Sequence, residues 1–314
     1  MSLSEFKIKY PLESKHARGR RWLLLVALSA WLLLPLSTAA ASVLVDGAWL
    51  EQHLNDQNVV VVDMSSESMQ YQRFHLPGAV RLPYSAIVER NRRGVTLRVP
   101  DERLFKILGL LGISSGSHVV VYDDMGGLEA GRLFWELERI GHAKVSVLDG
   151  GLVQWVLEGR KVVSAPAQPR PMKYLPTAKG AKDNEISGED VERIGKEGGA
   201  VLLDVRTLEE YQGNPRIPRS GHIPKAKWWP WDDTVALKKG FTIKSRKVLD
   251  MSLEKLGIDG RDVPLVTYCQ TGHRAAQAYL VLRHLGFNNI RLYDGSMAEY
   301  TQRRGAALVK GVRP

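Results

Sequence analysis

The sequence is poor in the residue types that build disulfides and metal sites. Its 314 residues include one cysteine, Cys269, which excludes an intramolecular disulfide. No pair of His or Cys residues has the spacing of metal ligands, so we expect no metal site. No dense run of Lys and Arg interleaved with aromatic residues occurs, and we therefore expect no nucleic-acid partner. The formal net charge is +10, of which residues 1–41 contribute +4, and the weakly basic remainder favours small anionic substrates.

The N-terminal segment combines positive charge with an apolar run. Its first 21 residues hold six basic and two acidic side chains, residues 22–36 are largely apolar, and small residues follow up to Ala41. This layout is typical of a secretory signal peptide. We therefore expect residues 1–41 to be removed and the protein to be periplasmic, without stable membrane association. An uncleaved membrane anchor is the alternative, because the run from Trp22 to Ala41 is just long enough to span a bilayer.

Five short segments occur twice in the same order, 141 to 147 residues apart. This recurrence predicts two copies of one domain, residues 42–163 and 184–314. The Pro-rich stretch between them, residues 164–183, is interpreted as an extended linker. The matched segments are Val59–Asp63 with Ala200–Asp204, His75–Ala79 with His222–Ala226, His118–Tyr122 with Pro264–Tyr268, Ile140–His142 with Leu285–Phe287, and Val147–Gly151 with Arg291–Ser296.

Both copies alternate short apolar segments with helical ones. In the first copy, a predicted helix over residues 132–139 separates apolar strands at 119–122 and 145–148. Residues 275–285 take the place of that helix in the second copy. Such a pattern predicts an α/β fold in which each domain has a mostly parallel central sheet flanked by helices on both faces. Functional sites in such sheets lie at the carboxyl ends of the strands.

The single cysteine lies at such a strand end. Leu265 to Tyr268 form an apolar run, Cys269 ends it, and polar and cationic residues follow before a predicted helix. A helix N-terminus offers free backbone N–H groups and the positive end of the helix dipole, which favour a thiolate, as do the neighbouring His273 and Arg274. The alternative is a small buried side chain. A core cysteine, however, would stand within the apolar run.

The segment from Cys269 to Arg274 resembles the active-site loop of the rhodanese-like sulfurtransferases, a six-residue loop led by cysteine between a central strand and a helix. The resemblance implies that Cys269 takes a sulfane sulfur from a small anionic donor such as thiosulfate. It would hold this sulfur as a persulfide and pass it to cyanide or a thiol, with no cofactor. The related dual-specificity phosphatases have a loop one residue longer and fit less well. The residues implied to cradle the persulfide are Gln270, Thr271, Gly272, His273 and Arg274.

The first copy has no thiol at the matching position. If Tyr122 corresponds to Tyr268, Asp123 stands where Cys269 does, and Asp124 follows it. Two carboxylates cannot form a persulfide and would repel an anion, so we expect the first domain to be catalytically silent. Tandem rhodaneses show the same division between a silent N-terminal and a catalytic C-terminal domain.

Three cationic residues near Cys269 have two interpretations each. The resemblance implies that Arg206 binds the anionic donor, whereas the structural alternative is a surface arginine paired with Glu209 or Glu210. Arg274 would either bind the substrate or form a salt bridge that shapes the loop. His273 would either take part in acid–base chemistry or only supply charge near the thiol.

Other polar and aromatic residues are interpreted as structural. Asp204 and His222 recur as Asp63 and His75 in the copy without a thiol, which favours roles in holding turns and loops. The cluster Trp228–Trp231 is interpreted as packing between the domains, with an apolar wall beside the pocket as the alternative.

The sequence departs from the family at two places. Gln270-Thr271-Gly272 matches neither the thiosulfate-specific nor the mercaptopyruvate-specific loops, which leaves the donor open. Ser296 replaces the glycine that the first copy has at Gly151, and we expect this change to alter the turn near the C-terminal helix without abolishing the chemistry. The leading hypothesis is an exported sulfurtransferase. A non-catalytic sulfur carrier or protein-docking module on the same scaffold is the alternative.

Overall fold

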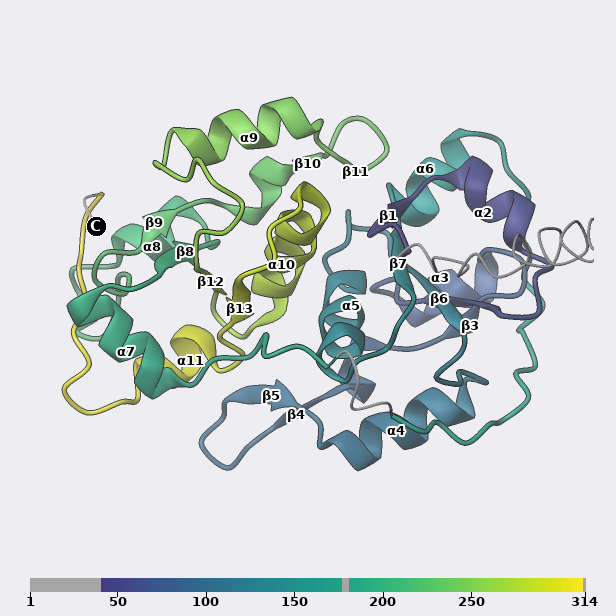
Figure 1. Ribbon diagram of the computed structural model, residues 1–314, viewed down its shortest axis with the longest axis horizontal. Coiled ribbons are helices and arrows are strands. Elements are labelled where there is room, and N and C mark those ends of the chain that lie inside the picture. Colours follow the sequence, from purple (N-terminus) through teal and green to yellow (C-terminus); the bar gives the residue numbers. More distant parts are fainter. Residues whose placement is uncertain (1–40, 177–180, 313–314) are drawn as a thin grey trace, which may run out of the picture. The chain divides into compact units, whose positions relative to one another are not determined.

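The structure is a computed structural model that describes residues 41–176 and 181–312 (Figure 1). The predicted signal peptide, residues 1–41, lies outside the described residues except for Ala41, and so do residues 177–180 of the predicted linker. Within the described ranges, no helix is both long enough and apolar enough to cross a membrane.

The first domain is built on a parallel sheet. Its strands are β1 (Leu44–Val45), β2 (Val59–Asp63), β3 (Val80–Arg81), β6 (His118–Tyr122) and β7 (Val145–Leu148), and its helices are α2 (Gly47–His53), α3 (Ser68–Arg73), α4 (Asp101–Leu110), α5 (Ala130–Arg139) and α6 (Gly151–Leu157). The strand order is β1-β7-β6-β2-β3, and every pair is parallel. Val119 and Val121 pack with α4 and α5, whereas Val120 packs with α2 and α6. The predicted layering is thus confirmed.

The second domain repeats this arrangement. Its strands are β8 (Val201–Asp204), β9 (Lys227–Trp228), β12 (Leu265–Tyr268) and β13 (Ile290–Leu292), and its helices are α7 (Gly188–Glu197), α8 (Leu208–Gln212), α9 (Arg246–Glu254), α10 (His273–Leu285) and α11 (Ser296–Tyr300). The order is β13-β12-β8-β9, again parallel. Leu265 packs with α9 and α10, and Val266 packs with α7 and α11.

The Tyr–His pair of each domain shows how closely the copies correspond. His75 Nδ1 donates to Tyr71 O (2.7 Å), and His222 Nδ1 donates to Tyr211 O (2.8 Å). Each imidazole stacks on the ring of the same tyrosine, with centroids 3.9 and 3.7 Å apart. The structural interpretation of His222 is therefore supported by its identical setting in both domains.

Each domain also sends a small hairpin to the other. The hairpins are β4 (Val88–Arg90) with β5 (Thr96–Arg98), and β10 (Val235–Ala236) with β11 (Thr242–Ile243). Arg98 N donates to Asp294 Oδ2 and Ile243 N donates to Asp149 Oδ1, both at 2.7 Å. Because Asp149 and Asp294 are equivalent in the repeat, the two domains exchange the same hydrogen bond in both directions.

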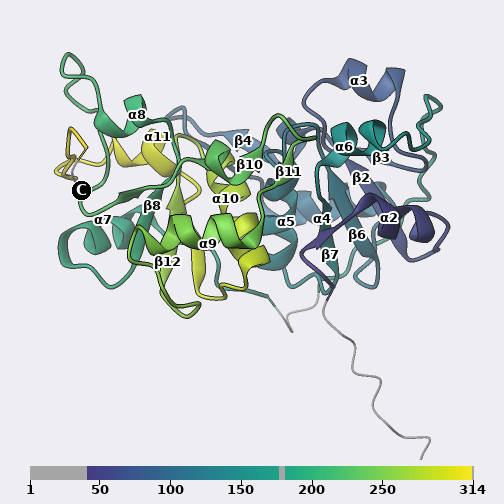
Figure 2. The ribbon, with the colours of Figure 1, turned by 90° about the horizontal axis from the view of Figure 1, so that it is seen from above.

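Helices α5 and α10 lie side by side where the domains meet (Figure 1, Figure 2). Gly131 permits this approach, because a Cβ there would lie 2.9 Å from both Ala276 O and Gln277 Cα. Farther along, Tyr279 Oη donates to Glu138 Oε2 (2.7 Å) across the interface. One hydrophobic core includes buried residues of both domains, so the domains share their packing rather than only a polar contact.

The predicted linker follows the surface of the first domain. Met172 N donates to Gly109 O at the end of α4 (2.8 Å). Tyr174 is buried, and its hydroxyl lies 3.0 Å from His142 Nδ1. These contacts fix at least residues 172–174 of the linker to the first domain.

Candidate functional site

Cys269 begins the loop that joins β12 to α10. Residues 269–274 are called the Cys269 loop below. Tyr268 pairs with Asp204 at the ends of β12 and β8, so Cys269 stands at the carboxyl edge of the sheet, as predicted. Gly272 is the N-cap of α10 and has φ 78°, a conformation that favours glycine. The Cys269 side chain is fully buried.

The Cys269 loop carries backbone donors that the protein does not use. Among the described residues, the N–H groups of Gln270, Thr271, His273 and Arg274 have no hydrogen-bond acceptor. Unpaired N–H groups at the start of a 13-residue helix, together with the positive end of its dipole, attract negative charge. The loop can therefore stabilise an anion, including a thiolate.

The side chain of Ser296 joins two backbone N–H groups of the Cys269 loop. Its hydroxyl oxygen accepts hydrogen bonds from Cys269 N and Gly272 N, both at 3.1 Å, and donates to Tyr293 O at 2.8 Å. Ser296 has φ 46°, in the left-handed region where the equivalent Gly151 of the first domain has φ 51°. The departure from glycine thus supplies an acceptor that holds both ends of the turn.

Arg274 forms a salt bridge that shapes the loop. Its Nη1 and Nη2 donate to Glu210 Oε2 (2.7 Å) and Oε1 (2.9 Å). Glu210 is itself fixed, because it forms a capping box with Thr207 at the start of α8. The guanidinium remains partly exposed. Substrate binding by Arg274 stays a prediction.

Arg206 is buried, and its partner differs from both of those expected. Its Nε and Nη2 donate to Asp204 Oδ1 (2.9 Å) and Oδ2 (2.6 Å), and Nη2 also donates to Gly221 O (2.8 Å). The expected surface pairing with Glu209 or Glu210 is therefore wrong, because the side chain folds back onto its own strand end. These bonds favour a structural role, and donor binding by Arg206 stays a prediction.

Asp204 orders the turn after β8, as predicted. Its Oδ1 accepts Arg206 N (3.1 Å), just as Asp63 Oδ1 accepts Ser65 N (2.8 Å) in the first domain.

The tryptophan cluster binds groups within the second domain. Trp228 Nε1 donates to Arg206 O (2.9 Å), and the buried Trp229 donates to Ser252 Oγ (3.0 Å). These contacts favour a packing role for the cluster, and they show that Trp228 and Trp229 pack within the second domain and not only between the domains.

His273 reaches into the first domain. Its Nε2 lies 3.0 Å from Glu129 Oε2, and its ring lies 4.4 Å from the ring of Tyr84, centroid to centroid. Tyr84 belongs to the short helix η2 (Tyr84–Ala86), and Glu129 precedes α5. No local sequence pattern indicates Tyr84 or Glu129, because both reach the Cys269 loop only through the contact between domains.

In the equivalent loop of the first domain, the side chain of Asp123 accepts the hydrogen bonds of the backbone N–H groups. Asp123 Oδ1 accepts the N–H groups of Met125 (3.0 Å) and Gly127 (2.9 Å), and Oδ2 accepts those of Glu129 (2.8 Å) and Ala130 (2.9 Å). Burial raises the pKa of Asp123, while these four donors oppose the shift. Repulsion of an anion by Asp123 stays a prediction. In addition, the Asp123 carboxyl group occupies the position beside these N–H groups that a bound anion would take.

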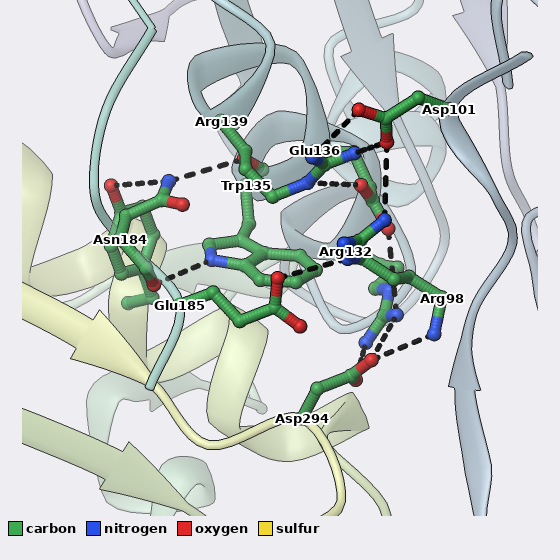
Figure 3. A network of polar contacts seen from close by, with 10 residues as sticks. Arg98, Asp101, Arg132, Trp135, Glu136, Arg139, Asn184, Glu185 and Asp294 are labelled. Atoms are coloured by element: carbon green, nitrogen blue, oxygen red, sulfur yellow. Dashed lines mark hydrogen bonds and ion pairs between the residues drawn. The ribbon is translucent and has the colours of Figure 1, made fainter. Parts of the chain in front are cut away.

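A buried ionic network supports the Cys269 loop from the first domain (Figure 3). A Cβ on Gly272 would lie 2.6 Å from Asp294 Oδ1, so the loop packs directly on this carboxylate. Arg132 of α5 binds Asp294 with Nη1–Oδ1 at 2.5 Å and Nη2–Oδ2 at 3.2 Å. Both side chains are buried, so loss of either would leave a costly unpaired charge. The network continues through Glu136, Arg139, Asp101 and Arg98.

The comparisons with known proteins agree with this geometry. The family model for the rhodanese-like domain matches residues 46–158 and 187–303. The sulfur carrier protein TtuD of Thermus thermophilus is 32% identical over 287 residues, which cover 87% of this chain and 98% of TtuD. A thiosulfate sulfurtransferase of Corynebacterium glutamicum is 32% identical over 270 residues, 82% of this chain and 87% of that protein. The Tum1 protein of Saccharomyces cerevisiae has a similar fold, with a TM-score of 0.73, 20% identity and coverage of 87% and 99%.

Two substitutions of Ser296 distinguish the effect of its hydroxyl group from the effect of its left-handed backbone conformation on stability. Ser296→Gly and Ser296→Ala both remove the acceptor for Cys269 N and Gly272 N. Only alanine keeps a Cβ at φ 46°, so we expect Ser296→Ala to be about 1 kcal/mol less stable than Ser296→Gly. Denaturant unfolding measures the difference. Equal stability of the two variants would contradict this account of the turn.

Glu136 makes the stability of the ionic network depend on pH. Burial raises the pKa of Glu136 to about 7, although the charges of Arg132 and Arg139 oppose this shift, whereas the pKa of an unfolded glutamate is about 4.3. Between these values the folded chain binds more protons than the unfolded one, so this contribution to stability falls as pH rises. The stability of Glu136→Gln relative to the unsubstituted protein should therefore increase from pH 5 to 7. Parallel stability curves from denaturant unfolding would refute the assignment.

Proposed function

The chain belongs to the rhodanese-like family, and from this premise we propose that it is a sulfurtransferase that acts through a persulfide on Cys269. It moves a sulfane sulfur from a donor such as thiosulfate to cyanide or a thiol. One observation carries the proposal. The only thiol of the chain stands at the N-terminus of α10, beside four backbone N–H groups without a protein acceptor.

The first half-reaction loads the sulfur. The Cys269 thiolate attacks the outer sulfur of thiosulfate, the sulfur–sulfur bond of the donor breaks, and sulfite leaves with the electron pair. The unpaired N–H groups of the Cys269 loop donate hydrogen bonds to the charged sulfur. Their preorganisation comes from Ser296 and from the salt bridge between Arg274 and Glu210.

The second half-reaction returns the enzyme to its starting state. Cyanide or a thiolate attacks the outer sulfur of the persulfide, and Cys269 leaves as a thiolate. The two steps predict ping-pong kinetics. The first domain takes no part as a sulfur acceptor, because Asp123 stands in place of the thiol and occupies its own loop.

A sulfur carrier that transfers only to a protein partner is the second candidate. The similarity to the sulfur carrier protein TtuD favours it. The complete burial of Cys269 also favours it, because a partner could open the site during docking. Steady-state assay with excess thiosulfate and cyanide separates the candidates, since only the sulfurtransferase turns over without a protein acceptor.

Loading of Cys269 is directly measurable. After incubation with thiosulfate, intact-mass spectrometry should show the added mass of one sulfur atom, which cyanide should remove. The same treatment should leave Cys269→Ala unchanged, and Cys269→Ser should fold normally but lack turnover. If thiosulfate adds no sulfur, 3-mercaptopyruvate is the next donor to test. Uptake by Cys269→Ala, or substantial turnover by Cys269→Ser, would defeat the assignment.

We also propose that the protein is exported with residues 1–41 as a cleaved signal peptide. The basic start, the apolar run of residues 22–36 and the small residues before Ser42 support this proposal. Expression of the full chain in a bacterium should give a periplasmic protein whose mass begins at Ser42. A membrane-bound protein that begins at Met1 would favour the anchor, and a full-length cytosolic protein would contradict export.

A further inference from the structure

A cluster of Tyr84, Glu129 and His273 beside the Cys269 loop includes a buried hydroxyl group without a hydrogen-bond partner. Among the described residues, Tyr84 Oη is buried and forms no hydrogen bond. The Tyr84 ring packs against the imidazole of His273, and His273 Nε2 in turn lies 3.0 Å from Glu129 Oε2. Buried polar atoms normally have partners, so the unpartnered Tyr84 hydroxyl group is available to bind another group.

Tyr84 supplies the hydroxyl group of this cluster. Tyr84 lies at the Cys269 loop, because its ring packs against His273, a residue of that loop, with the ring centroids 4.4 Å apart. Burial, which is the largest effect, and the nearby negative charges raise the pKa of Tyr84, although Arg132 opposes them. The phenol therefore keeps its proton at neutral pH and acts as a hydrogen-bond donor.

The second domain offers an internal comparison. Leu82-Pro83-Tyr84 follows β3 just as Trp229-Pro230-Trp231 follows β9, and each proline precedes a short 3-10 helix. Trp231 is therefore the repeat equivalent of Tyr84. Tyr84 therefore carries a hydroxyl group at a position where the second domain has a tryptophan.

We propose that Tyr84 donates a hydrogen bond to the outer sulfur of the persulfide on Cys269, so that the domain without a thiol contributes a group to the reacting atom. This inference rests on the proposed function. Hydrogen bonding withdraws negative charge from the outer sulfur and makes it a better electrophile. When cyanide attacks, a carbon–sulfur bond forms, the sulfur–sulfur bond breaks and its electron pair returns to Cys269. The hydrogen stays on Tyr84 throughout.

The test is a single-turnover discharge of the loaded protein. The unsubstituted protein and Tyr84→Phe are loaded with thiosulfate or 3-mercaptopyruvate, freed of donor and mixed with cyanide, and persulfide loss is followed by intact mass. We expect Tyr84→Phe to load but to discharge about tenfold more slowly, since a hydrogen bond to a charged group contributes at least this factor. Its melting temperature should not fall, because the removed hydroxyl group has no protein partner.

Tyr71→Phe is the matched control. It also removes a buried hydroxyl group from the first domain, but one that donates to Ala79 O at 2.8 Å. This variant should melt at a lower temperature and discharge at the unsubstituted rate. Discharge of Tyr84→Phe within about twofold of the unsubstituted protein, or equal slowing in both variants, would overturn the role of Tyr84. If the unsubstituted protein takes up no sulfur from either donor, the proposed function itself fails.

Discussion

The backbone N–H groups between a central strand and its following helix impose the main constraint on both domains. A helix start leaves N–H groups that its own turns cannot satisfy, and burial makes them costly unless something accepts their hydrogen bonds. The first domain meets this need with the carboxyl group of Asp123. In the Cys269 loop, Ser296 accepts two backbone N–H groups, and four other N–H groups of the loop have no acceptor among the residues that the structure describes. The two loops thus differ in the acceptor of these N–H groups. In the first domain it is a side chain of the protein, whereas in the second domain it would be a bound anion.

The two domains depend on each other for the shape of these loops. Each hairpin donates a backbone N–H to an aspartate of the opposite domain, and α5 and α10 approach closely at Gly131. Arg132 then holds Asp294 against Gly272, so a side chain of the first domain fixes the turn that carries Cys269. A domain without a thiol therefore remains necessary to the geometry around the thiol.

Local patterns in the sequence predicted much of the fold and the centre of the site. Apolar runs and their recurrence gave the parallel sheets and the duplicated domain, and the end of one run located Cys269 at the carboxyl edge of its sheet. Repetition also identified Asp204 and His222 as structural. The predicted partner of Arg206 is wrong, because pairing with Glu209 or Glu210 presumes a surface arginine, whereas Arg206 is buried and binds Asp204.

Contacts that join distant parts of the chain had no local signal. Arg132 and Asp294 are 162 residues apart in sequence, and nothing around either residue indicates the other. The same holds for Tyr84 and His273, which meet only when the domains pack. Asp123 was recognised as the replacement for cysteine. Its role as an internal acceptor depends on loop conformation, which residue type alone does not specify.

The complete burial of Cys269 also bears on chemical durability. Oxidation of a thiolate beyond sulfenic acid is generally irreversible, and a chain with one cysteine has no second thiol to rescue it through a disulfide. A peroxide in solution, like the thiosulfate of the proposed reaction, reaches a side chain with no accessible surface only when the surrounding structure opens. The lifetime of the thiol therefore depends on how often the structure around Cys269 opens as well as on the intrinsic reactivity of the thiol.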